Sequence, residues 1–194
     1  MVKVAFFRET IDIPEDVDVQ VEENSKVTIK GPEGGPLEKD FSHARGIKIS
    51  KENDQLVFSA NFPKGSTVSL ANTIINIVQN IIKGVQKSYK YVCKICSSHF
   101  PFTVEVKERK KELHVVNFLG EKAPRVIKYK PSLMDVEVKD DDVYLIGPDK
   151  ELLGQVAANL KKICHIKLKD PRIYQDGVYL FQKKLGNKIL WEIR

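Results

Sequence analysis

The stretch YVCKICSSHF holds the side chains best suited to metal or redox chemistry. Cys93 and Cys96 form a Cys-x-x-Cys pair, and His99 follows them. Cys164 and His165 could complete a zinc site. The surrounding residues, however, are typical of a β-strand, in which residues three apart point to opposite faces. A zinc knuckle needs a tight turn and a redox pair needs a helix N-terminus. We therefore favour buried thiols in a sheet, and expect neither a metal nor another cofactor.

A glycine turn and four scattered histidines offer two further candidate sites. Gly31 and Gly34 in GPEGGP have the spacing of the loop that clamps the nucleic-acid backbone in KH domains. The turn follows a predicted strand and carries Glu33 where such a loop is usually basic, so we interpret it as a hairpin turn. No histidine pairs with a serine or cysteine and an acid in a recognisable pattern. The absence of such a catalytic pattern from the sequence predicts a protein that is not an enzyme and has no small-molecule substrate.

Basic residues interleaved with aromatic residues and glycine form three clusters, KSYKYVCK, GEKAPRVIKYK and KLKDPRIYQDGVYLFQKKLGNK. Lysine and arginine neutralise phosphates, aromatic rings stack on bases, and glycine lets a backbone come close. The clusters together favour a nucleic-acid partner; the alternative is a basic protein-interaction module that binds an acidic partner. The candidate nucleic-acid-binding residues are Lys122, Arg125, Lys128, Lys167, Lys169, Arg172, Tyr174, Gly177, Lys183 and Lys184.

The GEKAPR turn is expected to face nucleic-acid phosphate. Gly120 lets the turn tighten, and Lys122 and Arg125 are predicted to reach outward.

Residues 167–184 are predicted to form an extended arm that doubles back at a tight Asp176–Gly177 turn. Arg172 is expected to be the strongest single contact, because a guanidinium can grip a phosphate with two hydrogen bonds. Tyr174 is expected to stack or pack beside it. Asp176 is assigned to the turn and not to a contact with the partner.

Charge is segregated along the chain, whose formal net charge is +6. Residues 83–134 and 164–194 carry +8 and +4, whereas residues 1–82 and 135–163 carry −3 each. This segregation suggests one anionic partner bound by one part of the molecule, although solvated strand faces would explain it equally well from charge alone.

The composition is that of an ordinary globular protein, with 42% hydrophobic and 30% charged residues. No apolar run is long enough to span a bilayer, and Glu9 and Asp12 interrupt any apolar leader. We therefore expect no secretion and no membrane partner. Three cysteines without a disulfide-scaffold spacing suit a reducing compartment.

Two segments have the periodicity of amphipathic helices. Residues 67–83 have a broad apolar face; Ser66 or Thr67 is expected to cap this helix and Gly84 to end it. The second helix is expected at about 149–163, with Asp149 as its N-cap. Its buried face should contain Leu153, Val156, Ala157 and Leu160.

Most of the remaining chain is predicted to form short strands separated by turn signals. The expected strands are 17–21, 26–31, 37–41, 46–50, 55–60, 87–96, 102–108, 112–118, 124–130, 134–138 and 142–146. Many short strands with two helices indicate an α+β fold with antiparallel or mixed sheets.

An internal sequence repeat suggests that the chain contains a duplicated domain. DVQVEENSKVTIKGP and DVEVKDDDVYLIGP share acid-Val-x-Val, a polar turn, a β run and Gly-Pro. We therefore predict two similar tandem domains, each with sheets packed on one helix. The expected domains are an N-terminal one at 1–84 and a C-terminal one at 85–194 with the basic arm.

Several motifs resemble those of the universal ribosomal protein L-six family of the large subunit, in its archaeal and eukaryotic branch. They are VDVQVEENSKVTIKGPEG, NIIKGVQKSYKYVCKICSSHFPF, NFLGEK and DPRIYQDGVYLFQKK, and the resemblance extends from Ile11 to about Lys184. The tail after Gly186, NKILWEIR, departs from the family's pattern.

The resemblance implies a function. A member of this family would be a structural constituent of the large ribosomal subunit. It would bind ribosomal RNA mainly through its C-terminal domain, near the sarcin–ricin loop and the site where translation factors dock. Its partners would be that RNA and neighbouring ribosomal proteins. It would be located in the cytoplasm, with nucleolar assembly if eukaryotic.

Overall fold

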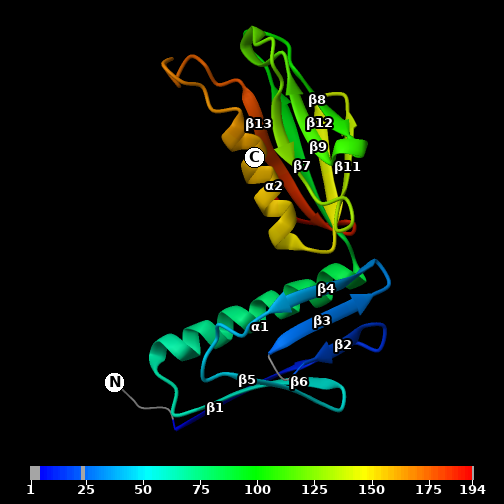
Figure 1. Ribbon diagram of the computed structural model, residues 1–194, viewed down its shortest axis with the longest axis vertical. Coiled ribbons are helices and arrows are strands. Elements are labelled where there is room, and N and C mark those ends of the chain that lie inside the picture. Colours follow the sequence, from blue (N-terminus) through cyan, green and yellow to red (C-terminus); the bar gives the residue numbers. More distant parts are fainter. Residues whose placement is uncertain (1–4, 23–24, 194) are drawn as a thin grey trace. The chain divides into compact units, whose positions relative to one another are not determined.

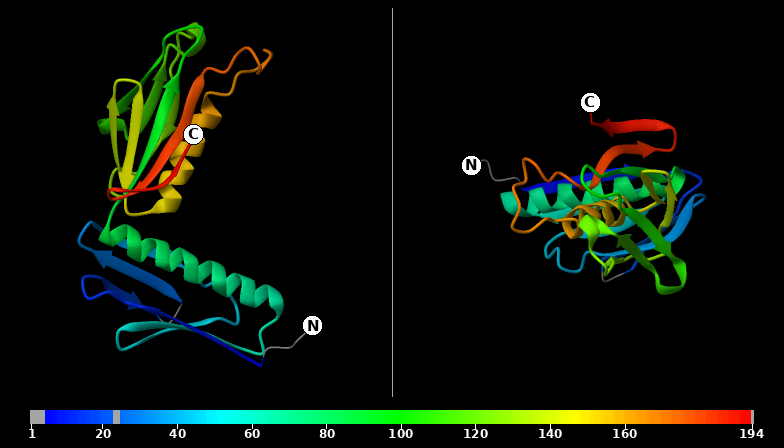
Figure 2. Two further views of the ribbon diagram at one scale, coloured as in Figure 1. Left: turned by 180° about the vertical axis from the view of Figure 1, so that it is seen from behind. Right: turned by 90° about the horizontal axis from the view of Figure 1, so that it is seen from above.

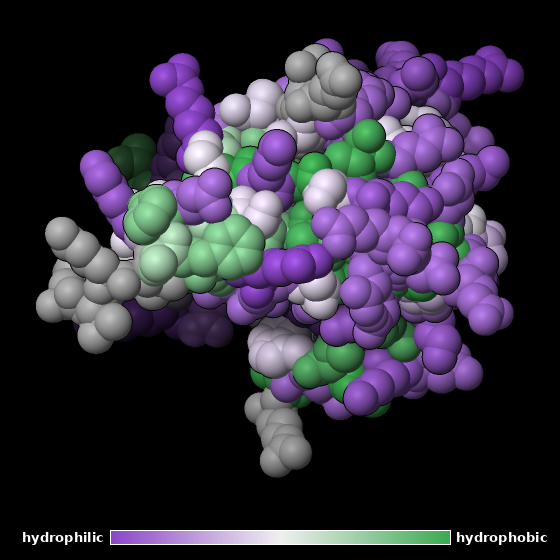
Figure 3. Space-filling view, turned by 90° about the horizontal axis from the view of Figure 1, so that it is seen from below, coloured by the Kyte–Doolittle hydropathy of each residue, from purple (hydrophilic) through white to green (hydrophobic). Residues whose placement is uncertain are grey.

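The computed structural model describes residues 5–22 and 25–193. The chain divides into two units: unit 1 extends up to Lys87 and unit 2 begins at Ser88 (Figure 1). Each unit combines antiparallel sheets with one helix, which confirms the predicted α+β fold. On the face seen from below, hydrophilic side chains predominate, and hydrophobic ones lie in small patches between them (Figure 3). Neither helix of the described part is long and apolar enough to cross a bilayer.

Unit 1 consists of two three-stranded antiparallel sheets and a long helix. Its first sheet has the order β1-β6-β5 and its second the order β2-β3-β4. The elements are β1 (Phe6–Asp12), β2 (Asp18–Val21), β3 (Lys26–Gly31), β4 (Gly34–Asp40), β5 (Lys48–Glu52), β6 (Gln55–Asn61) and α1 (Gly65–Gln86). The EENS turn predicted between β2 and β3 includes residues 23 and 24, which lie outside the described residues. Gly31 pairs with Gly34, so GPEGGP is the hairpin turn that was predicted.

The ends of α1 differ from the prediction. The helix begins at Gly65 after Lys64, which makes no side-chain capping hydrogen bond, so neither Ser66 nor Thr67 is the N-cap. It also continues past Gly84 to Gln86. Val85 is fully buried and packs against Gly31 of β3. This tertiary contact carries the helix two residues beyond the glycine that local propensity favours as its end.

Unit 2 contains a five-stranded antiparallel sheet of order β11-β12-β7-β13-β14 and a three-stranded one of order β10-β9-β8. The strands are β7 (Tyr89–Cys96), β8 (Thr103–Lys107), β9 (Glu112–Val116), β10 (Arg125–Lys128), β11 (Asp135–Lys139), β12 (Asp142–Gly147), β13 (Gly177–Leu185) and β14 (Lys188–Glu192). Short 3-10 turns occur at Glu108–Lys110 and Phe118–Gly120. One hydrophobic core joins the two sheets and the helix α2 (Lys150–Ile163).

The helix α2 agrees with the sequence pattern. The Asp149 side chain accepts hydrogen bonds from the backbone N–H groups of Glu151 and Leu152, at 2.9 and 3.4 Å, as an N-cap does. Its buried residues are the predicted ones, Leu153, Val156, Ala157 and Leu160. Figure 2 shows α2 lying along β13, with the segment after the helix returning into that strand.

Three strands were not predicted, namely β1, β13 and β14. The tight turn expected at Asp176–Gly177 does not exist: Gly177 is the first residue of β13 and pairs with Cys96. The chain turns earlier, where the backbone N–H groups of Ile173 and Tyr174 donate to the carbonyl of Asp170. The tail after Gly186 forms β14, the edge strand of the five-stranded sheet.

Candidate nucleic-acid interface

Three loops meet at one end of unit 2, and we call this surface the loop end: residues 97–102, 117–124 and 164–176 (Figures 1 and 2). Hydrogen bonds tie the loops together. The Asn117 amide donates to the carbonyl of Pro101 at 2.8 Å. Asp176 accepts from the backbone N–H groups of Ser98 and His99. Segments far apart in sequence therefore form one surface.

Arg125 fastens the second loop to the end of α2. Its guanidinium donates to both carboxylate oxygens of Glu121 and to the carbonyls of Ile163 and His165. It also lies over the Phe118 ring, 4.4 Å from the centroid. The hydrogen bonds from Arg125 lower the pKa of Glu121 below its usual value, although burial opposes the shift. Arg125 therefore does not reach outward as predicted, because its donors are used within the fold.

Three of the remaining predicted cations of the loop end are exposed and unpaired within the described residues. Lys122, Lys167 and Arg172 face solvent, and their charged groups have no hydrogen-bond or ion-pair partner among residues 5–22 and 25–193. The backbone around Arg172 is fixed: its N–H donates to the Asp170 carboxylate at 2.9 Å. These side chains are free to bind phosphate without first breaking a protein contact.

Tyr174 packs inside the loop end instead of standing open. Its ring is stacked on His99, with centroids 4.2 Å apart and planes inclined by 16°. The Lys169 ammonium lies over the Tyr174 ring at 4.6 Å. The imidazole covers one face of the Tyr174 ring, and the ammonium occupies further space over the ring. Of the two roles predicted for Tyr174, the structure favours packing.

Asp176 is the carboxylate behind this stack, and the sequence did not indicate its partner. Its side chain is 0% exposed and accepts from the His99 imidazole, with 2.6 Å between Oδ2 and Nδ1. Burial alone would raise the pKa of Asp176, but the hydrogen bonds from His99 and Ser98 outweigh it and hold the pKa below its usual value. The sequence signal was an acid within a basic arm, and the arm also contains Asp170.

Lys183 and Lys184 lie at the other end of β13 from the loop end. Gly177 begins the strand, and six residues at about 3.3 Å per residue place Lys183 roughly 20 Å away from it. The Lys183 ammonium lies between the rings of Tyr91 and Trp191, 5.4 and 5.3 Å from their centroids. The structure therefore does not bring these two lysines to the same surface as Arg172.

Most tyrosines of the basic clusters belong to the core. Tyr89 and Tyr91 on β7 and Tyr129 after β10 are all buried. Burial raises the pKa of Tyr89 to about 12. These rings pack in the core and do not stack on bases.

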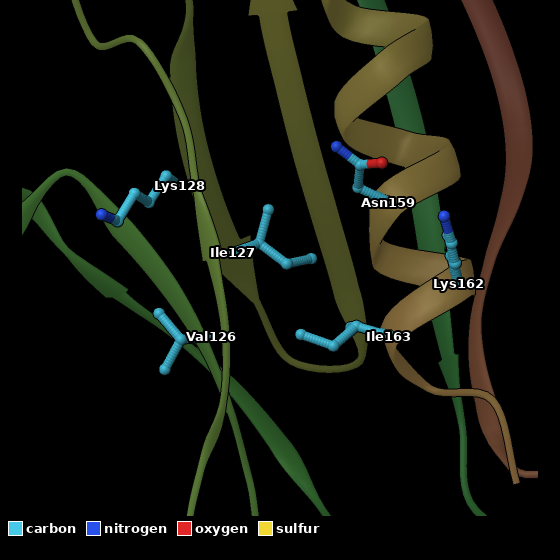
Figure 4. A pocket seen from close by; sticks show the side chains of 6 residues that line it. All are labelled: Val126, Ile127, Lys128, Asn159, Lys162 and Ile163. Carbon is cyan, nitrogen blue, oxygen red and sulfur yellow. The ribbon is translucent and has the colours of Figure 1, made fainter.

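A groove between β10 and α2 continues from the loop end. Ile127 and Ile163 extend toward each other across it, and Asn159 and Lys162 project from α2 (Figure 4). The hollow has a volume of about 540 Å³, and Lys128 lies on its rim. Lys128 is exposed, so the predicted cation stands beside an open groove that is apolar at its base.

An acidic turn limits the basic surface on the side of β11. Residues 140–142 are three consecutive aspartates, of which two lie between β11 and β12 and Asp142 begins β12. The Asp141 carbonyl accepts from the backbone N–H of Ile95 at 2.7 Å. Ile95 lies next to the end of β7, so the turn is at the same end of the sheet as the loops. An anionic partner is therefore directed toward the other side, where residues 164–176 lie.

The Cys93–Cys96 pair lies on β7, as the strand pattern predicted. Cys93 is fully buried and Cys96 is exposed, since three residues along a strand reverse the side-chain direction. Burial raises the pKa of the Cys93 thiol to about 12.

The chain is similar to known proteins along almost its whole length. The family model described as Ribosomal protein L6 matches residues 13–88 and 100–177, one segment in each unit. The large ribosomal subunit protein uL6 of Staphylothermus marinus is 42% identical, with 93% of this chain and 97% of that protein covered. The proteins of the same name from Ignicoccus hospitalis and Methanobrevibacter smithii are each 39% identical over 95% of this chain.

Proposed function

The chain belongs to the ribosomal protein L6 family, and on this premise we propose that it is a structural constituent of the large ribosomal subunit. Its role is to bind ribosomal RNA and to hold RNA and neighbouring ribosomal proteins in place in the cytoplasmic ribosome. It performs no catalysis. The loop end of unit 2 is the RNA-binding surface.

The observation that carries this proposal is the placement of free cations on a rigid surface. Lys122, Lys167 and Arg172 come from two loops that are fastened to each other through Arg125. Residues 88–194 contain 21 lysines and arginines and 14 acids, a net charge of +7. Preordered cations bind phosphate with a smaller loss of side-chain and loop entropy than cations on separate flexible loops.

The site of binding on the ribosome is proposed from the family resemblance. The RNA bound by the loop end lies near the sarcin–ricin loop and the site where translation factors dock. Duplex RNA presents its backbone and 2′-hydroxyls more readily than its base edges. Binding is therefore directed mainly by shape and phosphate position, which suits a surface of lysines and one free arginine.

Sedimentation of the tagged protein from a native lysate tests the proposal. We expect the protein to migrate with the large subunit and to be released by ribonuclease. A protein that binds an acidic protein partner instead would keep its sedimentation after ribonuclease treatment. Recovery entirely in the slowly sedimenting fractions, without RNA, would refute the ribosomal assignment.

A further inference from the structure

One imidazole nitrogen of His99 is hydrogen-bonded within the fold, and the other has no partner among the described residues. Its Nδ1 lies 2.6 Å from the buried carboxylate of Asp176. An ionised carboxylate only accepts hydrogen bonds, so Nδ1 must carry the hydrogen. The other nitrogen, Nε2, then points away from Asp176. The His99 side chain is 28% exposed, and within the described residues Nε2 has no hydrogen-bond partner.

The direction of Nε2 is fixed by the surroundings of the ring. Tyr174 stacks on one face of the imidazole, and the Lys169 ammonium lies over the Tyr174 ring. The backbone N–H of His99 donates to the same carboxylate at 3.0 Å, which fixes the loop that carries the ring. A side chain held at three points on an exposed surface is preordered for a ligand.

We propose that His99 is a further RNA-binding residue, whose Nε2–H donates to a phosphate oxygen and whose ring is positioned by Asp176 and Tyr174. The inference rests on the proposed function, because it assigns a new contact to the same surface. It also gives Asp176 a role other than the turn that the sequence suggested.

Phosphate binding by His99 requires a protonated ring. The neutral imidazole with its hydrogen on Nδ1 offers only a lone pair at Nε2, and a phosphate oxygen cannot donate to it. Protonation turns Nε2 into a donor and gives a charge-assisted hydrogen bond. The buried Asp176 carboxylate balances the imidazolium charge. RNA affinity should therefore rise as the pH falls through the range in which histidine takes up a proton.

Charged groups of both signs lie around His99. The Asp176 carboxylate is hydrogen-bonded to Nδ1, and the Lys169 ammonium lies over the Tyr174 ring. On the side of α2, Lys161 and His165 line a hollow with Tyr174 and Asp176. The aspartate turn at residues 140–142 lies beside the end of β7. His165 is a second histidine of the loop end, so the test must separate its contribution from that of His99.

The test measures binding of the full chain to a transcript of the complete large-subunit ribosomal RNA at pH 6 and pH 8 and constant salt. Wild type should bind about tenfold more tightly at pH 6, the size of one charge-assisted hydrogen bond. His99→Gln should lose this difference. His114→Gln should keep it, because His114 is paired with Glu112 at 2.9 Å on β9, outside the loop end. The two substitutions remove the same titrating group from the same unit.

A second measurement does not involve RNA. The imidazole nitrogen chemical shifts of His99 should report the hydrogen on Nδ1 in wild type and a loss of that preference in Asp176→Asn. Asp176→Asn should also lose the pH difference in RNA binding. If this buried substitution unfolds unit 2, the exposed His99→Gln variant decides alone.

The outcomes separate this inference from the proposed function. Equal pH dependence in wild type and His99→Gln, with RNA still bound, would overturn the His99 contact and leave the RNA-binding function in place. Tighter binding at pH 8 would overturn it too, since the neutral ring would then be accepting a hydroxyl hydrogen. If wild type bound no RNA at either pH, both the His99 contact and the proposed RNA-binding function would be refuted.

Discussion

At the scale of single residues, two arginines of similar sequence context have opposite roles. Arg125 uses its guanidinium on Glu121 and on two carbonyls at the end of α2, whereas the Arg172 side chain is exposed and unpaired within the described residues. Both lie in basic clusters next to a proline. Only their long-range surroundings distinguish a structural contact from a free one.

Arg172→Ala should weaken binding to a large-subunit RNA transcript and flatten the slope of log affinity against log salt by about one unit, since one phosphate contact is lost. The choice of RNA should not change. Titrations at several salt concentrations measure the slope. Lys26→Ala is the control, because Lys26 is paired with Glu38 at 2.8 Å in unit 1. Equal slopes for wild type and Arg172→Ala would show that this side chain does not meet phosphate.

Arg125→Ala should instead lower the free energy of unfolding, by about 1–3 kcal/mol, because it removes the donor from the partly buried carbonyl of Ile163 and from Glu121. Chemical denaturation measures the change. Lys122→Ala in the same loop is exposed and unpaired within the described residues, so it should stay within about 0.5 kcal/mol of wild type. Similar stability in both variants would argue against a structural role for Arg125.

At the scale of elements, the internal repeat in the sequence corresponds to two hairpins. Each hairpin ends at a glycine that has no room for a side chain. In unit 1, β2–β3 ends at Gly31, where an added Cβ would lie 2.7–2.8 Å from Val85 atoms. In unit 2, β11–β12 ends at Gly147, where an added Cβ would lie 2.7 Å from the carbonyl oxygen of Leu133. The shared Gly-Pro marks the place where each hairpin comes closest to a neighbouring segment.

Gly31→Ala should destabilise unit 1 by about 1–3 kcal/mol, because the Val85 backbone carbonyl cannot move aside as a flexible side chain can. Gly154→Ala is the contrast: it lies inside α2 with nothing within 4 Å of an added Cβ. That substitution should stabilise unit 2 by about 0.5–1 kcal/mol through helix propensity. Thermal and denaturant unfolding report both. A stabilising Gly31→Ala would contradict the packing of α1 on β3.

At the scale of the whole molecule, charge and structure divide the chain at the same place. The chain up to Lys87 has 11 lysines and arginines against 12 acids, and the rest carries the +7. A cut at Gly84, as the predicted domains 1–84 and 85–194 would have it, falls inside α1 and removes the buried Val85 from unit 1. The division between Lys87 and Ser88 keeps that contact.

Residues 88–194 expressed alone should keep most of the affinity for large-subunit RNA, and residues 1–87 should bind it weakly, since their net charge is close to neutral. Binding of each fragment to the same transcript measures this, with circular dichroism to verify that both are folded. Tighter binding by residues 1–87 would show that the RNA-binding surface lies in unit 1, which would contradict the proposal.

The sequence by itself determined the elements whose signals are local. The cap and buried face of α2 follow from Asp149 and the helical period, and the strands of β7 and β12 follow from alternation. Local signals failed where packing overrode them: α1 passes Gly84 because Val85 is buried, and β13 begins at the residue that was expected to turn.

The tertiary structure alone decided which candidate site residues work together. Arg125 meets carbonyls 38 and 40 residues away, and Asp176 meets His99 77 residues away. No local sequence pattern encodes such pairs. The same strands and helices could be arranged in other folds, in which different loops would be neighbours. The strand β13 likewise separates Lys183 from Arg172, although the two are close in sequence, since an extended chain adds about 3.3 Å per residue.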